Sequence, residues 1–204
     1  MPIRPPLRLG FLASHGGSGM RAVLAAIEAG DLAAEARILV TNNRDCAAVQ
    51  AAEAVRLPWR HVSISTAGAA EAADRAIAEA LTHAGAELVV LSGYMRKLGP
   101  ETLQRYRGRI LNIHPALLPR HGGQGLYGRK VHEAVLASGD QVSGASIHVV
   151  DADYDTGPVI ARVEVPVLPG DGAEDIEARV RAVEPGLMVQ TLRRISSGEL
   201  SLES

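Results

Sequence analysis

Apolar and polar positions follow two different periods along the first half of the chain. Apolar runs of strand length occupy residues 7–14, 35–42, 60–64, 87–93 and 108–114. Apolar positions also recur at helical spacing in residues 20–30, 46–56 and 69–84. Because strands that alternate with helices pair in parallel, this half of the chain predicts a doubly wound α/β core.

The pattern changes after residue 114. A glycine-rich loop precedes a helical segment and two long alternating segments, at residues 121–128, 129–138, 142–150 and 159–167. The alternating pair indicates a mostly parallel sheet with an antiparallel C-terminal portion. A last helix is expected at residues 173–196, with a kink or break at Pro185, whose backbone cannot donate a hydrogen bond.

The composition is that of ordinary globular protein. A chain of 204 residues with 47% apolar residues can bury one sizeable core, which favours a single domain over residues 1–204. The formal net charge of -2 gives no broad basic field, so we expect small-molecule substrates and no nucleic-acid partner. The choice between a monomer and a homodimer stays open.

The sequence lacks the signals of disulfides, metal sites, signal peptides and membrane spans. Cys46 is the only cysteine, which excludes an intrachain disulfide and a cysteine-rich zinc site, and we expect it to be a small buried apolar residue. His114, His121, His132 and His148 lack the tight spacing of metal ligands, so no metal is expected. The N-terminal apolar run is too short for a signal peptide, and no segment approaches the roughly 20 apolar residues of a membrane span. We therefore expect a soluble cytoplasmic protein.

The first loop has the composition of an anion site. A strand ends near Ser14, glycines at positions 16, 17 and 19 permit a tight turn, and a helix begins near Met20. Backbone N–H groups at a helix N-terminus attract phosphate. The segment GSGMRA also matches the G-x-G-x-x-A pattern of Rossmann-like dinucleotide sites, but the second strand ends without the acidic residue that would hold a ribose. Phosphate binding, dinucleotide binding and a purely structural turn all remain open here.

The fifth apolar run ends in the segment RILNIHPALLP, residues 109–119, which places an amide and an imidazole two positions apart. Alternate residues of a strand share a face, and ligands bind beyond the carboxyl ends of the strands in open α/β sheets. Asn112 and His114 can therefore project into one cleft. The alternative is that both are buried polar groups hydrogen-bonded to neighbouring backbone.

Four motifs occur in an order that resembles a known family. They are SHGGSGM (14–20), GYMRKL (93–98), NIHPALLP (112–119) and DADYDTGPVI (151–160). Together they resemble the phosphoribosylglycinamide formyltransferases of purine synthesis, over nearly the whole chain. The resemblance implies the formyltransferase fold, a Rossmann-like domain with a phosphate-binding half near residues 1–110 and a catalytic and folate-binding half near residues 111–204.

The resemblance also implies a reaction and a set of site residues. The formyl group of 10-formyltetrahydrofolate would pass to the amine of glycinamide ribonucleotide, with Asn112, His114 and Asp155 as the catalytic residues. Gly17, Ser18 and Gly19 would hold the substrate phosphate, and Pro115 and Glu184 would lie near the rest of that substrate. The folate pocket would be lined by Met95, Arg96, Lys97, Leu98, Asn112, Asp151 and Asp155.

The expected mechanism is direct attack of the amine on the formyl carbon. Protonated His114 and the amide of Asn112 would donate hydrogen bonds to the developing oxyanion. Asp155 would orient His114 and raise its pKa. Three positions depart from the pattern of many relatives: Gly19 stands where they carry Asn, Ala70 where they carry Arg, and the loop 121–128 is about five residues longer.

Less specific roles remain open for several of these residues. Asp151 and Asp153 have the composition of a turn, Glu184 reads equally well as a solvated charge, and Arg96 with Lys97 as a surface pair. His148 is expected to be a pocket or sheet-facing side chain rather than a catalyst. Competing functions are a formyltetrahydrofolate hydrolase, a methionyl-tRNA formyltransferase and a non-catalytic nucleotide-binding module. The first two are disfavoured because the chain offers no room for the extra domains that those relatives carry.

Overall fold

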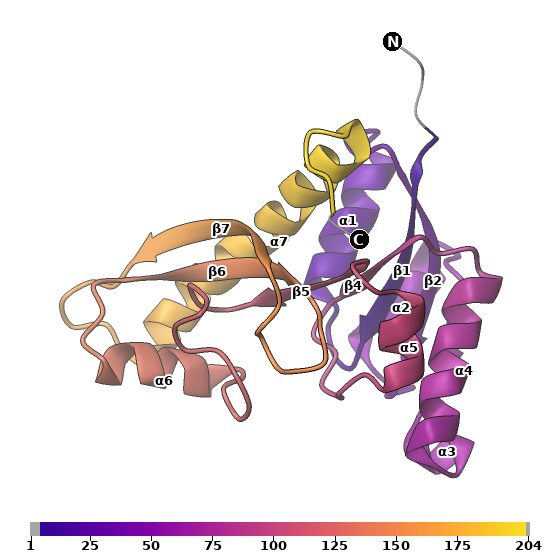
Figure 1. The fold of residues 1–204 in the computed structure, drawn as a ribbon. Coiled ribbons are helices and arrows are strands. Elements are labelled where there is room, and N and C mark those ends of the chain that lie inside the picture. Colours follow the sequence, from indigo (N-terminus) through magenta and orange to yellow (C-terminus); the bar gives the residue numbers. More distant parts are fainter. Residues whose placement is uncertain (1–4, 203–204) are drawn as a thin grey trace.

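The computed structural model of the chain describes residues 5–202 and contains one seven-stranded sheet of order β3-β2-β1-β4-β5-β6-β7 (Figure 1). The strands are β1 Leu7–Ala13, β2 Ala34–Thr41, β3 Trp59–His61, β4 Leu88–Leu91, β5 Ile110–His114, β6 Val142–Val149 and β7 Val159–Pro166. The first five pair in parallel, whereas β6 pairs antiparallel with β5 and β7. The predicted fold class, with its antiparallel C-terminal portion, is confirmed.

Seven helices accompany the sheet in the described residues. They are α1 Ser18–Glu28, α2 Ala47–Ala54, α3 Ile64–Ala67, α4 Ala70–His83, α5 Pro100–Arg105, α6 Arg129–Ala137 and α7 Ala173–Ser197. All five helices expected from apolar periodicity are present, with ends that differ by a few residues. The short helices α3 and α5 were not expected. Ser63 explains the first, since it forms a capping box with Thr66.

Helices cover both faces of the sheet, so the strands of the parallel part are buried on each side (Figure 1). One core cluster joins residues of α1, α2, α6 and α7 to alternate strand positions such as Leu9, Phe11 and Val90. The other joins α4 and α5 to the intervening positions, including Leu12 and Val89. This alternation explains why the strands read as continuous apolar runs.

Gly10 shows how closely α4 approaches the sheet. A Cβ atom at this position of β1 would lie 2.5 Å from Cδ2 of Leu81, which α4 contributes to the core. A side chain here would therefore push the helix away from the strand. The glycine allows the close packing that holds the carboxyl end of β1 beside the rest of the site.

Of the kink or break predicted at Pro185, the break is wrong, since α7 is continuous for 25 residues. Its buried side chains lie on both sides of the proline, with Ile176 and Val180 before it and Met188 and Leu192 after it. The packing of both segments against the same core stabilises the helix across the missing hydrogen bond. Among the described residues, no helix combines the length and the apolar character needed to cross a membrane.

Candidate active site

The carboxyl ends of β1, β4 and β5 meet at one edge of the sheet. The strand order reverses its direction around β1, because β2 lies on one side of it and β4 on the other. Ligands of open α/β sheets bind at such a reversal, outside the carboxyl ends of the strands. The loops that follow β1, β4 and β5 all begin here, so the fold places the three motifs at the ends of these strands along one edge.

His114 ends β5 and is buried, with only 5% of its side chain exposed. Its Nδ1 atom lies 3.3 Å from Oδ2 of Asp155, and its Nε2 atom lies 2.8 Å from the backbone oxygen of His121. Both neighbours are acceptors. A neutral imidazole has one N–H and satisfies one of them, whereas the protonated ring satisfies both.

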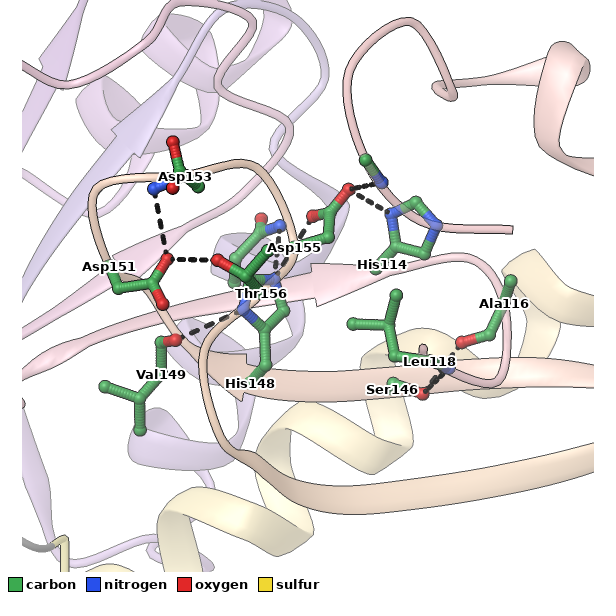
Figure 2. Close-up of polar contacts among 12 residues, drawn as sticks. His114, Ala116, Leu118, Ser146, His148, Val149, Asp151, Asp153, Asp155 and Thr156 are labelled. Atoms are coloured by element: carbon green, nitrogen blue, oxygen red, sulfur yellow. Dashed lines mark hydrogen bonds and ion pairs between the residues drawn. The ribbon is translucent and has the colours of Figure 1, made fainter. Parts of the chain in front are cut away.

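Asp155 comes from the connection between β6 and β7 and points toward His114, as the sequence predicted (Figure 2). Its backbone has a φ of 58°, a left-handed conformation that is uncommon for a residue with a side chain. Its Oδ2 atom also accepts a hydrogen bond from the N–H of Gly123 at 3.0 Å. The carboxylate is therefore held from two directions, by β5 and by the loop that follows it.

Asp151 stabilises the turn that carries Asp155. Its Oδ1 atom accepts hydrogen bonds from the backbone of Asp153 at 3.2 Å and from the hydroxyl of Thr156 at 2.8 Å (Figure 2). These contacts match the turn role that the sequence left open for this acid.

His148 is the site residue that the sequence did not assign to the catalytic cluster. It faces Asn112 across the antiparallel β5–β6 pair, with its Nε2 atom 3.1 Å from Nδ2 of the amide. The same Nε2 atom lies 3.4 Å from Oδ1 of Asp155, so Asp155 lies between two imidazoles (Figure 2). This histidine reaches the site because of the register of β6 against β5, and no short sequence motif predicts that register.

Burial and charge act in opposite directions on these groups. Burial lowers the pKa of His114 below its ordinary value, and the raising effects of Asp155 and the His121 carbonyl do not cancel it. Asp155 therefore acts on the pKa of His114 in the expected direction, but burial, which the sequence did not reveal, outweighs it. For Asp155, burial acts to raise the pKa, but hydrogen bonding to His148 and the nearby His114 outweigh burial and lower it.

The first loop forms a helix N-terminus with the backbone geometry of an anion site. Gly17 precedes α1 with a φ of 58°, and a Cβ atom there would lie 2.9 Å from Cβ of Ala48. The N–H of Met20 donates to Oγ of Ser92 at 2.9 Å. Within residues 5–202, the N–H groups of Ser18 and Gly19 have no hydrogen-bond partner, and they lie at the positive end of the helix dipole.

The end of β2 holds this loop in place through amide side chains. Oγ of Ser14 donates to Oδ1 of Asn42 at 2.6 Å, and Nδ2 of Asn43 donates to the backbone oxygen of Ser14 at 3.2 Å. These positions would carry the ribose-binding acid of a dinucleotide site. Here they tie β2 to the first loop instead.

The segment after β4 borders a cavity. Oγ of Ser14 accepts a hydrogen bond from the N–H of Met95 at 2.8 Å, which joins this segment to the first loop. Arg96 and Lys97 are exposed and line a cavity of about 610 Å³, whereas Leu98 is buried. Ala70 lines the same cavity. A second cavity of about 380 Å³ lies against Asp155 and Tyr154.

The two other predicted substrate residues, Pro115 and Glu184, lie in different places relative to this cluster. Pro115 follows His114 directly and is half-buried. Glu184 lies on α7, where burial raises its pKa to about 7, with a further increase from Glu177 that Arg181 opposes. Within the described residues, Glu184 forms no hydrogen bond or ion pair with Asn112, His114 or Asp155. The described chain contains no group of three potential metal ligands.

An α/β sheet that gathers an amide, a carboxylate and two imidazoles beside a helix N-terminus with unpartnered N–H groups has the features of an enzyme active site. Sequence comparison gives the particular family. Residues 7–192 match the family described as Formyl transferase, and the chain belongs to that family.

Individual relatives carry a more specific name. The chain is 40% identical over 197 residues to the phosphoribosylglycinamide formyltransferase of Mycobacterium tuberculosis, covering 97% of this chain and 88% of that protein. It is 37% identical over 192 residues to the chloroplastic phosphoribosylglycinamide formyltransferase of Arabidopsis thaliana, covering 92% of this chain but only 65% of the plant protein.

A solved structure agrees in fold over almost the whole chain. Glycinamide ribonucleotide transformylase 1 from Symbiobacterium toebii superposes with a TM-score of 0.90 at 32% identity, covering 98% of this chain and 92% of that one. The arrangement of parallel and antiparallel strands is therefore that of a formyl transferase.

Proposed function

We propose that the chain transfers the formyl group of 10-formyltetrahydrofolate to the amine of glycinamide ribonucleotide, a step of de novo purine synthesis. The observation that carries this proposal is the linked cluster at the carboxyl end of β5. Asp155 lies within 3.4 Å of both His114 and His148, and His148 contacts Asn112 at 3.1 Å. The names of the relatives support the same reaction.

The reaction moves one proton in addition to the formyl group. The amine nitrogen attacks the formyl carbon, and a tetrahedral intermediate with a negatively charged oxygen forms. The bond between that carbon and N10 of the folate then breaks, while the attacking amine loses a proton and N10 gains one. The site must therefore stabilise an oxyanion and relay one proton.

The amide of Asn112 suits the first task, to which protonated His114 adds its positive charge because both of its ring nitrogens face Asp155 and the His121 carbonyl, and Asp155 suits the second. The amide of Asn112 can donate to the oxyanion, where one such donor contributes roughly 3 kcal/mol. Because burial lowers the pKa of His114, we infer that the ring is neutral in the empty site and takes up a proton as negative charge develops beside it. Asp155 then pairs with the imidazolium and passes the proton toward N10.

The substrates would lie on opposite sides of this cluster. The free N–H groups of Ser18 and Gly19, beside Gly17, would bind the phosphate of the ribonucleotide, with Pro115 and Glu184 near its glycinamide and ribose. The folate would lie against the segment Met95 to Leu98 and the turn Asp151 to Asp155. Arg96 and Lys97 would face its glutamate carboxylates.

The decisive experiment mixes the purified protein with 10-formyltetrahydrofolate, with and without glycinamide ribonucleotide, and follows tetrahydrofolate release. Release that requires the ribonucleotide and forms formylated ribonucleotide supports the proposal. Release without the ribonucleotide would indicate a hydrolase instead, since water would have replaced the amine. No release, together with NAD binding, would favour a nucleotide-binding module.

We also propose that the enzyme acts in the cytoplasm, without a metal and without nucleic acid, as a monomer or a homodimer. The net charge of -2 supports the exclusion of nucleic acid as a partner. Activity that persists after treatment with a chelator would support the metal-free mechanism. Sedimentation over a range of protein concentrations would decide between the two oligomeric states.

A further inference from the structure

His121 makes two contacts that the proposed reaction does not require. Its backbone oxygen lies 2.8 Å from Nε2 of His114, and its own Nε2 atom lies 2.7 Å from Oδ2 of Asp140. The two side chains of the second pair are largely buried, with exposed fractions of 14% and 11%. Asp140 lies between α6 and β6, so this pair ties the loop after β5 to a different part of the fold.

The backbone around His121 leaves little freedom for that loop. The residue has a φ of 55°, a conformation that residues with side chains rarely adopt. A Cβ atom at Gly122 would lie 2.4 Å from Cδ2 of Leu118 and 3.3 Å from Cβ of Asp155. The N–H of Gly123 donates to Asp155 at 3.0 Å. Residues 121–123 therefore form a constrained segment of backbone that contacts both His114 and Asp155.

The carbonyl contact favours one tautomer of His114, because at 2.8 Å it is shorter than the 3.3 Å between Nδ1 and Asp155. A carbonyl oxygen can only accept, so a hydrogen bond here requires the hydrogen of His114 to reside on Nε2. The other ring nitrogen, Nδ1, then gains and loses the proton, and it faces Asp155 at 3.3 Å. A displaced carbonyl would release the ring and allow the tautomer that leaves Nδ1 unable to accept a proton.

We propose that His121, anchored by Asp140, is a positioning residue that fixes the ring orientation and the tautomer of His114 through its backbone carbonyl. The role rests on the proposed function, because it matters to catalysis only if His114 takes part in formyl transfer. The side chain of His121 touches no reacting atom. It acts by holding its own peptide group against His114.

Several ionisable groups face the two histidines. The groups that influence His114 are Asp155 and His121 from loops, His148 from β6 and His132 from α6. Asp140 pairs with the side chain of His121 and also with the exposed side chain of Arg120. The carbonyl contact raises the pKa of His114, so its loss shifts that pKa further down.

The test compares His121→Phe, which keeps an aromatic ring without the polar contact, with His121→Gln, whose amide can still donate to Asp140. We expect His121→Phe to lower kcat about tenfold, to leave both KM values within about twofold and to shift the acidic limb of the pH profile to lower pH. His121→Gln should recover most of kcat, and Asp140→Asn should fall between them. Arg120→Ala is the matched control, since it removes an exposed partner of the same carboxylate, and it should behave like the wild type.

A second readout separates this proposal from the formyl-transfer proposal. Titration of the His114 ring by NMR reports its tautomer and pKa without any substrate. Wild-type protein that shows the Nε2–H tautomer but no formyl transfer would contradict the proposed function and leave the positioning role of His121 intact. An unchanged titration and tautomer in His121→Phe, with a thermal unfolding midpoint near that of the wild type, would overturn the positioning role. If His121→Phe unfolds, the same comparison between Asp140→Asn and wild type decides the matter.

Discussion

The two halves of the chain contribute to the site through different chemical groups. Residues 1–110 contribute mainly backbone, since Gly17 shapes a helix N-terminus where the N–H groups of Ser18 and Gly19 have no partner among the described residues. Residues 111–204 contribute side chains in contact with one another, above all His114, Asp155 and His148. The first half should therefore tolerate side-chain changes that preserve backbone conformation, whereas the second should lose activity when a single functional group changes.

The largest expected effect tests the side-chain half. We expect His114→Ala and Asp155→Asn each to reduce turnover by roughly 100-fold or more, equivalent to about 2.7 kcal/mol of transition-state stabilisation. Steady-state assays with both substrates measure this loss, and circular dichroism checks that the fold is retained. Glu79→Gln, which changes an exposed carboxylate on α4 away from the site, is the control and should keep near-normal turnover. Near-normal activity of both catalytic-site variants would remove the proposed roles.

The next effect tests the backbone half. Gly17→Ala should lower the free energy of unfolding by about 2 kcal/mol, because alanine disfavours the left-handed conformation and its Cβ would approach Ala48. The KM for the ribonucleotide should rise about tenfold while kcat changes little, since the phosphate is remote from the reacting amine. Denaturant unfolding and substrate-dependent rates measure the two effects.

Gly16→Ala provides a control within the same loop. A Cβ atom at this position would have no neighbour within 4 Å. The variant should therefore match the wild type in stability and in KM. If both substitutions changed KM equally, the loop would act through general flexibility rather than through the conformation of Gly17.

The sequence predicted the parallel half in some detail because its signals are local. Apolar periodicity places each strand and the longer helices from neighbours a few positions away, whereas the short helices α3 and α5 give no such signal, and glycines mark the turn after β1. Asn112 and His114 were found because strand alternation puts residues two apart on one face. Asp155 was found through a resemblance, not through periodicity.

The remaining features depend on contacts that no local pattern encodes. His148 reaches Asp155 only because β6 runs antiparallel to β5 in one particular register. The loop after β5 folds back so that His121 meets both His114 and Asp140. The pKa of His114 is lowered mainly by burial, and burial depends on the whole fold. Pro185 misled the interpretation of α7 because tertiary packing outweighed a local preference.

A smaller effect concerns Glu184, which lies in the side-chain half without a contact to the catalytic cluster. Its pKa of about 7 in the folded chain exceeds the unfolded value of roughly 4.3. Between these values the folded chain retains a proton that the unfolded chain has released. Its contribution to stability is therefore present below about pH 4 and is lost as the pH rises through 7.

Glu184→Gln should remove this pH dependence. The variant should match the wild type near pH 4 and exceed its free energy of unfolding by about 2 kcal/mol near pH 8, after allowance for partial exposure. Urea unfolding across this range measures the difference, and the exposed Glu133→Gln on α6 is the control. Parallel curves for Glu184→Gln and the wild type would show that the carboxyl is not held protonated by its surroundings.

The smallest effect concerns one of the contacts between the two halves, a cation–π pair beside the site. Nζ of Lys97 lies 5.4 Å from the ring centroid of Tyr154, so the segment after β4 meets the turn that carries Asp155. Exposed cation–π pairs contribute about 0.5–1 kcal/mol, so Tyr154→Leu should raise the KM for the folate by no more than about fivefold and leave kcat unchanged. Tyr127→Leu removes a similar pair with Lys130, at 5.1 Å, that joins neighbouring residues rather than the two halves. A rise in folate KM for the first substitution alone would show that bridging the halves matters, whereas equal values would reduce the contact to surface packing.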